Sequence, residues 1–192
     1  MDDDVIRAMA RWPNVPAVYG WMSLDRRGRW CLEGKPVGHR RAVEFMNRNY
    51  ACEQDGRWYF QNGPQRVYVD LDYTPWVVML DGSRSLRYHT GDAVEDLGGA
   101  WLDEEGNFLV LGDRGIALVC DRDLDALSKD LRLAGGAPCD EESLSRLVES
   151  PGGEHDGVHL VWREHRIPLA AIARDAVAAR FRFEPRPRCE DG

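Results

Sequence analysis

An arginine- and aromatic-rich segment at residues 57–68 is the part of the sequence best suited to hold a ligand. A guanidinium offers a fork of N–H donors to a phosphate, and an aromatic ring offers a flat surface on which a base can stack. Arg66 and Tyr68 lie two residues apart in an alternating pattern, so their side chains share one face of a strand. We predict that these two residues contact a small-molecule or nucleotide-like ligand, together with Arg57, Asn62 and Gln65.

Two carboxylates follow on the same strand. Asp70 and Asp72 alternate with Val69 and Leu71, which places both carboxylates on one face about 7 Å apart, at a rise of roughly 3.3 Å per residue. Such a pair can do acid–base work or bind a cation, so a small metal-dependent hydrolase is one alternative. The favoured interpretation is the solvated face of an edge strand.

Other catalytic and metal-binding patterns are missing from the sequence. There is no G-x-S-x-G, Walker or dinucleotide motif, and the nearest calcium-loop match fails at Ala126 and Arg132. His159 and His165 could approach each other across a hairpin, but no third ligand is specified by spacing. The five cysteines are scattered without a C-x-x-C pair, which favours reduced thiols. We predict no catalytic residue, no metal site and no cofactor, and favour a protein that is not an enzyme.

Composition and charge narrow the class of protein further. With 43% hydrophobic and 30% charged residues in 192, the chain can build a core and fold. No apolar run approaches the roughly 20 residues of a membrane span, and the first residues do not resemble a signal peptide, so we expect a cytoplasmic protein without membrane association. Residues 91–160 carry 17 acidic and five basic side chains, which argues against binding long nucleic acid.

The elements that would position these residues are hairpins and short helices. Alternation and turn signals predict hairpins at residues 17–34, 51–61 and 76–90 and a strand at 65–71, and an apolar stripe predicts a helix at about 39–49. The design of the first hairpin then recurs at a constant offset of 78 residues. The matching pairs are Leu24 and Leu102, Asp25 and Asp103, Gly28 and Gly106, Trp30 and Phe108, Leu32 and Val110, and Gly34 and Gly112.

The second copy is predicted to continue in the same order as the first. A helix is expected at about 122–133, a second helix is capped by Asp140 and ends before Pro151, and Asp156–Gly157 with the strand after it echoes Asp55–Gly56. After residue 169 we favour a last helix, with Ile172, Ala176 and Val177 inward, over an extended edge. We interpret the pattern as an internal duplication.

The sequence also resembles known families. The segments AMARWPNVPAVYGWMSLDRRGRW and NYACEQDGRWYFQNGPQRVYVDLDYTPWV are similar to an uncharacterised proteobacterial family of similar length. More remotely, the span from Gly28 to Trp76 resembles the bacterial domain of unknown function 1285 family, through its G-x-W strand, E-G-x-P turn, D-G hairpin and acidic segment before Trp76. The resemblance implies two duplicated α+β subdomains, the second loosely like a pleckstrin-homology fold. It also implies a small-ligand groove between them and a regulatory role.

We therefore expect an α+β protein with two tandem subdomains, each a curved antiparallel sheet packed on helices. The expected domains are residues 1–95 and 96–183, followed by a flexible tail at 184–192. The favoured function is a non-catalytic ligand-binding or regulatory module with its site between the subdomains. The alternative is a protein-interaction module that uses its acidic middle surface, including Asp103, Glu104 and Glu105, or its strand edges. The sequence does not indicate the oligomeric state.

Overall fold

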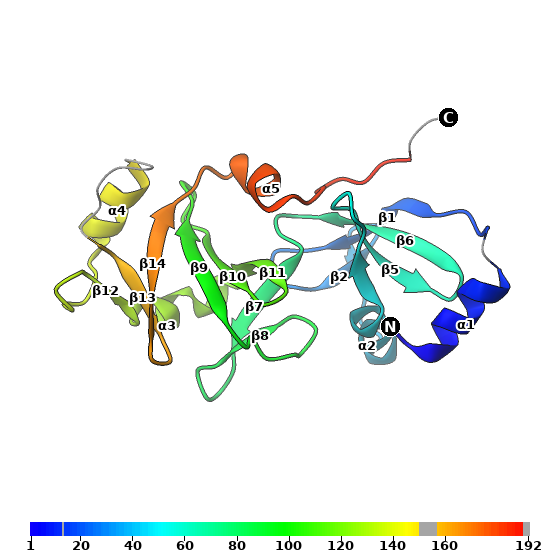
Figure 1. The fold of residues 1–192 in the computed structure, drawn as a ribbon, viewed down its shortest axis with the longest axis horizontal. Helices are drawn as coiled ribbons and strands as arrows, with labels where there is room; N and C mark the ends of the chain where they lie inside the picture. Colours follow the sequence, from blue (N-terminus) through cyan, green and yellow to red (C-terminus); the bar gives the residue numbers. More distant parts are fainter. Residues whose placement is uncertain (13, 150–156, 190–192) are drawn as a thin grey trace. The chain divides into compact units, whose positions relative to one another are not determined.

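The computed structural model describes residues 1–12, 14–149 and 157–189, which form two compact units. Unit 1 comprises Met1–Pro75, His89–Gly91 and the C-terminal segment from Arg182, and unit 2 comprises Trp76–Tyr88 and Asp92–Phe181. The α+β fold class with two sheets and few helices is confirmed (Figure 1). The hairpin predicted at residues 76–90 falls within the expected first subdomain, but Trp76–Tyr88 belong to unit 2 and only His89–Gly91 belong to unit 1.

Unit 1 is a six-stranded sheet with two helices. Its strands lie in the order β3-β2-β1-β6-β5-β4, and only β1 and β6 run parallel. The elements are α1 (Asp3–Arg11), β1 (Val18–Leu24), β2 (Trp30–Leu32), β3 (Lys35–Pro36), α2 (Arg40–Arg48), β4 (Tyr50–Cys52), β5 (Trp58–Asn62) and β6 (Gln65–Leu71). The expected helix at 39–49 is confirmed as α2.

Unit 2 is an eight-stranded sheet in the order β12-β13-β14-β9-β10-β11-β7-β8. Its strands are β7 (Trp76–Leu80), β8 (Leu86–Tyr88), β9 (Leu97–Leu102), β10 (Phe108–Gly112), β11 (Gly115–Val119), β12 (Leu131–Arg132), β13 (His159–Trp162) and β14 (His165–Ala171). Its helices are the 3₁₀ turn η1 (Asp121–Asp123), α3 (Leu124–Ser128), α4 (Glu141–Glu149) and α5 (Ala176–Phe181). Asp140 caps α4 as expected, because its Oδ1 accepts the Ser143 N–H at 2.9 Å.

The two sheets repeat one strand order. Reading β4-β5-β6-β1-β2-β3 in unit 1 and β12-β13-β14-β9-β10-β11 in unit 2 gives the same sequence of pairings, including one parallel contact, β6 with β1 and β14 with β9. In unit 2 the hairpin β7–β8 is added beside β11. The duplication predicted from the sequence therefore extends to the whole pairing pattern.

The matching turns agree in their hydrogen bonds. Gly28 N donates to Asp25 O at 3.0 Å, and Gly106 N donates to Asp103 O at 3.0 Å. Both glycines have positive φ, 73° and 79°, a conformation that strains other L-residues. In each turn the aspartate Oδ1 accepts two further main-chain N–H groups. The Leu-Asp-x-x-Gly pattern thus encodes the same turn twice.

Apolar alternation builds the core of unit 1. Val67, Val69 and Leu71 of β6 are buried, as the alternation predicts, and Leu24 of β1 is buried beside Leu71. Trp30 is 1% exposed, and its indole N–H donates to Asn47 Oδ1 at 2.7 Å, which pairs a buried donor. Burying each such aliphatic side chain stabilises the fold by about 1.5–3 kcal/mol.

The helix expected at 122–133 is wrong over its second half. Helix α3 ends at Ser128, and Leu131 lies in β12, where it pairs with Leu160 of β13. Leu131 is 3% exposed in this strand. Long-range pairing with β13 therefore overrides the local helical periodicity of the leucines.

The region after residue 169 begins as a strand rather than as a helix. Strand β14 continues to Ala171, and Ile172 N then donates to Leu102 O at 3.1 Å. Helix α5 starts only at Ala176, which is exposed, while Val177 is fully buried. The predicted last helix is therefore confirmed in part, four residues shorter at its start than the pattern with Ile172 required.

The tail expected at residues 184–192 makes backbone contacts with unit 1 at its start, and its residues 190–192 lie outside the described part of the chain. Leu71 N donates to Pro185 O at 2.8 Å, and Glu184 N donates to Gly56 O at 3.0 Å. Phe183, just before this segment, is 7% exposed. Prolines and charges predict little burial on composition alone, but here the backbone pairs with groups that unit 1 leaves available.

Candidate functional site

The predicted ligand-binding residues lie on the hairpin β5–β6 and divide into two groups. Asn62 and Gln65 pair at the tip of the hairpin, where Asn62 is exposed and the Gln65 amide donates to Pro16 O at 3.1 Å. Arg57, Arg66 and Tyr68 lie together farther along the strands. The five predicted residues therefore share one hairpin, but they do not converge on one point.

The arginines and the tyrosine are held by partners within unit 1. Tyr68 stacks on Tyr19 with ring centroids 4.5 Å apart, and the Arg57 guanidinium lies 5.0 Å from the Tyr68 ring centroid. Glu53 forms ion pairs with Arg57, at 2.9 Å, and with Arg66. Burial, with the neighbouring Glu53 carboxylate, raises the pKa of Tyr68 and keeps its phenol neutral.

A pocket of about 350 Å³ lies beside this cluster. Helix α1 and the segment after it supply one side, and β5–β6 supplies the other. The lining residues are Met9, Trp12, Val15, Ala17, Gln61, Pro64, Arg66 and Tyr68. Glu53 is the residue that the sequence reasoning missed. Its position in a turn before Arg57 gave no sign that it would hold two arginines.

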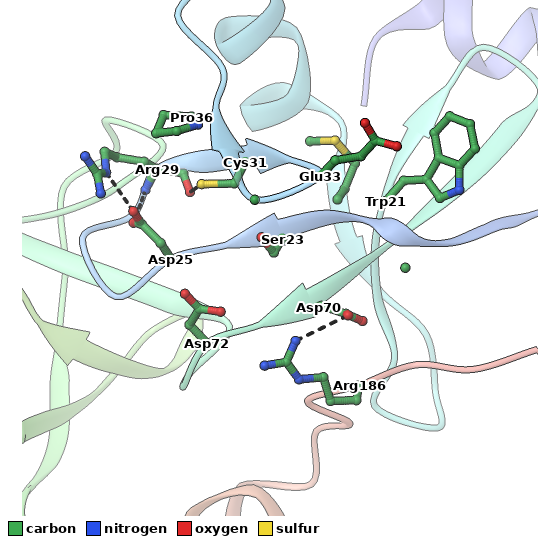
Figure 2. A pocket seen from close by; sticks show the side chains of 13 residues that line it. Trp21, Ser23, Asp25, Arg29, Cys31, Glu33, Pro36, Asp70, Asp72 and Arg186 are labelled. Carbon is green, nitrogen blue, oxygen red and sulfur yellow. Dashed lines mark hydrogen bonds and ion pairs between the residues drawn. The ribbon is translucent and has the colours of Figure 1, made fainter.

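A second pocket, of about 590 Å³, opens on the face of the sheet formed by β1, β2 and β6. We call it the carboxylate pocket, because Asp25, Glu33, Asp70 and Asp72 contribute to its lining. The other lining residues are Gly20, Trp21, Met22, Ser23, Arg29, Cys31, Gly34, Pro36 and Arg186. In Figure 2, Ser23 lies in the middle of this lining, with Asp25, Asp70 and Asp72 around it.

Two of the four carboxylates are already neutralised. Asp25 accepts the Arg29 guanidinium at 2.6 Å and the main-chain N–H groups of Arg27 and Arg29, so it is fixed in the turn. Asp70 accepts Arg186 Nη1 at 3.3 Å and Arg188 Nη1 at 3.2 Å, both from the C-terminal segment. Asp70 is only 14% exposed at its side chain. These groups contribute to structure before any ligand arrives.

Asp72 differs from both, because no side chain of the described residues forms an ion pair or hydrogen bond with its carboxylate. Burial raises the pKa of Asp72, and the nearby carboxylates of Asp25 and Asp70 raise it as well, while Arg186 and Arg26 act in the opposite direction. The backbone of Asp72 is fixed, since its N–H donates to Leu24 O at 3.0 Å. Asp72 is exposed, and a carboxylate that lacks a cationic partner among the described side chains is a place where a cation would be bound.

The remaining lining includes a thiol and an exposed ring. Cys31 is 6% exposed, and burial raises the pKa of its thiol, so it is protonated at neutral pH and is not an activated nucleophile. Trp21 is 59% exposed on a strand, which is unusual for so large an apolar side chain. Its ring face can take a cation by cation–π attraction.

The geometry does not favour metal chemistry at these residues. Within residues 1–12, 14–149 and 157–189, no three His, Cys, Asp or Glu side chains are grouped so that they could hold a metal ion. His159 and His165 belong to one hairpin, but they pair with Pro168 and Trp162 respectively rather than with each other. Asp70, proposed for the hydrolase alternative, carries two arginines.

The acidic stretch does not offer all of its carboxylates to a partner. Asp103 is fully buried and accepts three N–H groups of Glu105 and Asn107 in its turn. Glu104 accepts the Arg174 N–H, and Glu105 forms an ion pair with Arg174. Asp103 was therefore wrongly included in the acidic surface, because it holds the turn.

The described helices include none that is both long and apolar enough to span a membrane.

The sheet position that carries the carboxylate pocket in unit 1 has a counterpart in unit 2, which is lined by apolar residues. Ser23 pairs with Asp70 between β1 and β6, and the corresponding pair between β9 and β14 is Trp101 with Ala170. Asp72 N donates to Leu24 O, and the corresponding bond runs from Ile172 N to Leu102 O. Trp101 packs against Phe181 of α5, with ring centroids 5.1 Å apart. The same sheet position is thus polar and hollow in unit 1 and apolar and filled in unit 2.

Two solved structures are similar to the chain. A DUF1285 family protein from Silicibacter pomeroyi DSS-3 shares 21% identity at a TM-score of 0.47, covering 83% of this chain and 85% of that chain. A DUF1285 family protein from Shewanella baltica OS155 shares 12% identity at a TM-score of 0.40, covering 54% of this chain and 86% of that chain.

No curated protein matches the chain. The model of the DUF2944 family, described as "Protein of unknown function (DUF2946)", matches residues 1–188. That match spans both units and nearly the whole sequence, and the chain therefore belongs to this family of proteins of unknown function.

Proposed function

We propose that unit 1 is a non-catalytic module that binds a small, positively charged organic ligand in the carboxylate pocket. The observation that carries the proposal is the contrast between the two copies of the sheet. Trp101, Ala170 and Ile172 fill this position in unit 2 with apolar groups, so the shared frame does not require polar ones. Asp70 is explained in unit 1 by its ion pairs with Arg186 and Arg188, but the polar Ser23 and Asp72 need another reason, and a ligand supplies it.

The chemistry of the pocket favours a cation. Its four carboxylates outnumber its two guanidinium groups, Arg29 and Arg186, and Asp72 has no ion-pair partner among the described side chains. Its volume of about 590 Å³ falls within the range of about 300–1,000 Å³ that is usual for small-molecule sites. An amine or guanidinium on Asp72, with its chain against the Trp21 ring, would satisfy both groups.

An organic cation fits better than a metal ion. The carboxylates surround Ser23 instead of meeting at one point, and they form no metal-ligand group. An extended ligand with two cationic ends can reach separate carboxylates, whereas an ion needs several ligand atoms within about 2.6 Å. Polyamines and alkyl guanidines have the required shape and charge.

The test is a thermal-shift and calorimetric screen with spermidine, agmatine and arginine amide, and with acetate and AMP as anionic probes. A specific ligand at 100 times its dissociation constant adds about 2.7 kcal/mol of stability. We expect a cation to stabilise the protein and Asp72→Asn to weaken that binding at least about tenfold, a loss of about 1.4 kcal/mol. Asp125→Asn, which removes an exposed carboxylate in unit 2, is the matched control and should leave binding unchanged. Equal binding by both variants would contradict the proposal.

A nucleotide-like ligand at the Arg66–Tyr68 pocket is a second candidate. The observation in its favour is that Trp12, which is 50% exposed, lines the same pocket as Arg66, so an aromatic face and a guanidinium are available together. Arg66 would have to exchange Glu53 for a phosphate. In the same screen, stabilisation by AMP that is lost in Arg66→Gln but kept in Asp72→Asn would support this site.

A further inference from the structure

The C-terminal segment carries a guanidinium into the carboxylate pocket. Arg186 is one of the lining residues, and it reaches Asp70 from the far end of the sequence, together with Arg188 (Figure 2). We propose that residues 184–188 form a detachable strap whose Arg186 occupies the pocket and competes with its ligand. This inference rests on the proposed function for the identity of the competitor, but the opening of the strap can be tested without any ligand.

The strap is attached where the sheet leaves a backbone group available. The pairing of β5 with β6 runs only from Asn62 and Gln65 to Tyr59 and Tyr68, so β6 continues to Leu71 beyond it. Pro185 O accepts the Leu71 N–H at 2.8 Å, and Glu184 bridges to Arg57 in a parallel arrangement. The strap therefore adds a short strand-like contact to β6, and its removal would expose one main-chain donor.

A fixed point lies just before the strap. Phe183 is 7% exposed, and a Cβ on Gly56 would lie 2.5 Å from Arg182 O and 3.0 Å from Phe183 Cα. Gly56 has a φ of 90°, so its lack of a side chain serves both its own turn and the close approach of the chain. The segment is thus anchored at Phe183, and residues after it can move without loss of the anchor.

Pro187 of the strap is buried, and the other side-chain interactions of the strap are weak one by one. The side chains of Arg186 and Arg188 are 55% and 62% exposed, and ion pairs of such exposed groups are readily exchanged for water. Pro185 and Pro187 favour an extended chain whether or not it is bound, so docking costs little conformational entropy. A competing cation in the pocket could therefore displace the strap.

The competition between the strap and the ligand depends on positive charge. With Arg186 in place, one guanidinium contacts Asp70 and also acts on Asp72, whose pKa it lowers against the effect of burial. Without the strap, Asp70 loses both Arg186 and Arg188 and Asp72 loses the effect of Arg186, so both carboxylates attract an external cation more strongly. The strap and the ligand are thus alternative sources of positive charge for the same carboxylates.

Cys31 allows the opening of the strap to be measured. It lines the pocket together with Arg186 and is 6% exposed, so we expect its rate of alkylation to report access to the pocket. In a background with Cys52→Ser, Cys139→Ser and Cys189→Ser, two thiols remain, and Cys120, buried in unit 2, reports global unfolding. The rate of alkylation by iodoacetamide at each thiol is read by peptide mass spectrometry.

We expect Arg186→Gln/Arg188→Gln to raise the Cys31 rate about fivefold to tenfold, as loss of two exposed ion pairs implies, while the Cys120 rate is unchanged. Arg40→Gln/Arg41→Gln on α2 makes the same charge change on an exposed part of unit 1 and should have no effect. A chain ending at Phe183 provides a second variant without the strap. Unchanged Cys31 rates in both the double variant and the shortened chain would overturn the strap.

Calorimetry with agmatine then separates the strap from the proposed function. If both hold, the shortened chain binds agmatine at least about threefold more tightly than the full chain. Equal affinities would refute the competition while leaving the ligand site intact. Faster Cys31 alkylation with no binding of agmatine, spermidine or arginine amide by either chain would support the strap and refute the cation site.

Discussion

The hairpin β1–β2 of unit 1 and the hairpin β9–β10 of unit 2 share a frame and differ in the face they present. Asp25 and Asp103 make the same turn, and the strands beside them pair in the same register. On the outer face, Ser23 and Asp72 line a pocket in unit 1, where Trp101 and Ile172 are buried in unit 2. Asp25 and Asp103 therefore build the turn and sheet that both units share, whereas Ser23 and Asp72 are not needed for that shared structure.

The largest change in the free energy of unfolding is expected for the tryptophans, because the tryptophan of β9 is buried and the tryptophan of β1 is exposed. Trp101 is 8% exposed and packs on Phe181, so Trp101→Ala should lower the free energy of unfolding by about 3–5 kcal/mol. Trp21→Ala, at a tryptophan that is 59% exposed in the first copy, should cost less than about 1 kcal/mol. Urea unfolding measures both. Similar losses of unfolding free energy in the two variants would show that the two sheet faces are packed alike and would refute the contrast between the units.

The next largest loss of stability is expected at the turn that the two units share. Asp103 is fully buried and accepts three N–H groups, so Asp103→Ala leaves them unpaired and should cost about 2–4 kcal/mol. Asp25→Ala breaks the same turn at a more exposed position and should cost about 1–2 kcal/mol. Chemical denaturation of each variant gives the values. The frame would not be shared if Asp25→Ala had no effect.

A smaller effect is expected at the anchor of the C-terminal segment. Gly56→Ala places a Cβ against Arg182 O in a backbone conformation that disfavours side chains, and should cost about 2 kcal/mol. Gly63→Ala also has positive φ but meets nothing within 4 Å, so its cost should stay near about 1 kcal/mol. The difference in melting temperature isolates the close approach. Equal losses of stability in the two variants would mean that residues 182–183 move aside without cost when Gly56 gains a Cβ.

The smallest effect is the pH dependence from Asp72. Because its pKa is raised in the folded state, the folded protein binds this proton more tightly, and the resulting stability is present at low pH and lost as pH rises through the folded pKa. Asp72→Asn should remove this part of the pH dependence and change stability at pH 7 by less than about 0.5 kcal/mol, since solvent screens an exposed group. Urea unfolding from pH 3 to pH 7 measures it. A steeper pH dependence in the variant would contradict the cause assigned here.

Local patterns in the sequence predicted the frame well. The offset of 78 residues located the second hairpin, because an aspartate and a glycine with positive φ are needed to make that turn in each copy. Alternation placed Arg66, Tyr68 and Asp70 on the face of β6 opposite Val67, Val69 and Leu71, although Tyr68 is buried as well, under Tyr19 and Arg57. These features depend on neighbours a few residues apart, which a sequence displays directly.

Features that depend on distant parts of the chain could not be predicted in this way. Asp70 is completed by Arg186, 116 residues later, and nothing near either residue indicates the pair. Leu131 follows a helical pattern but joins β13, and Glu53 holds two arginines from a turn. The carboxylate pocket combines β1, β2, β6 and the C-terminal segment, so it becomes visible only once the sheet order is known.

The most direct test of the account is to place the unit 2 residue in the unit 1 pocket and measure cation binding. Ser23→Trp puts a large ring at the position that corresponds to Trp101, and calorimetry with agmatine compares it with the unchanged protein. We expect that the unchanged protein binds agmatine, that Ser23→Trp abolishes binding, and that both proteins are folded by circular dichroism. Undiminished binding by a folded Ser23→Trp variant would contradict it.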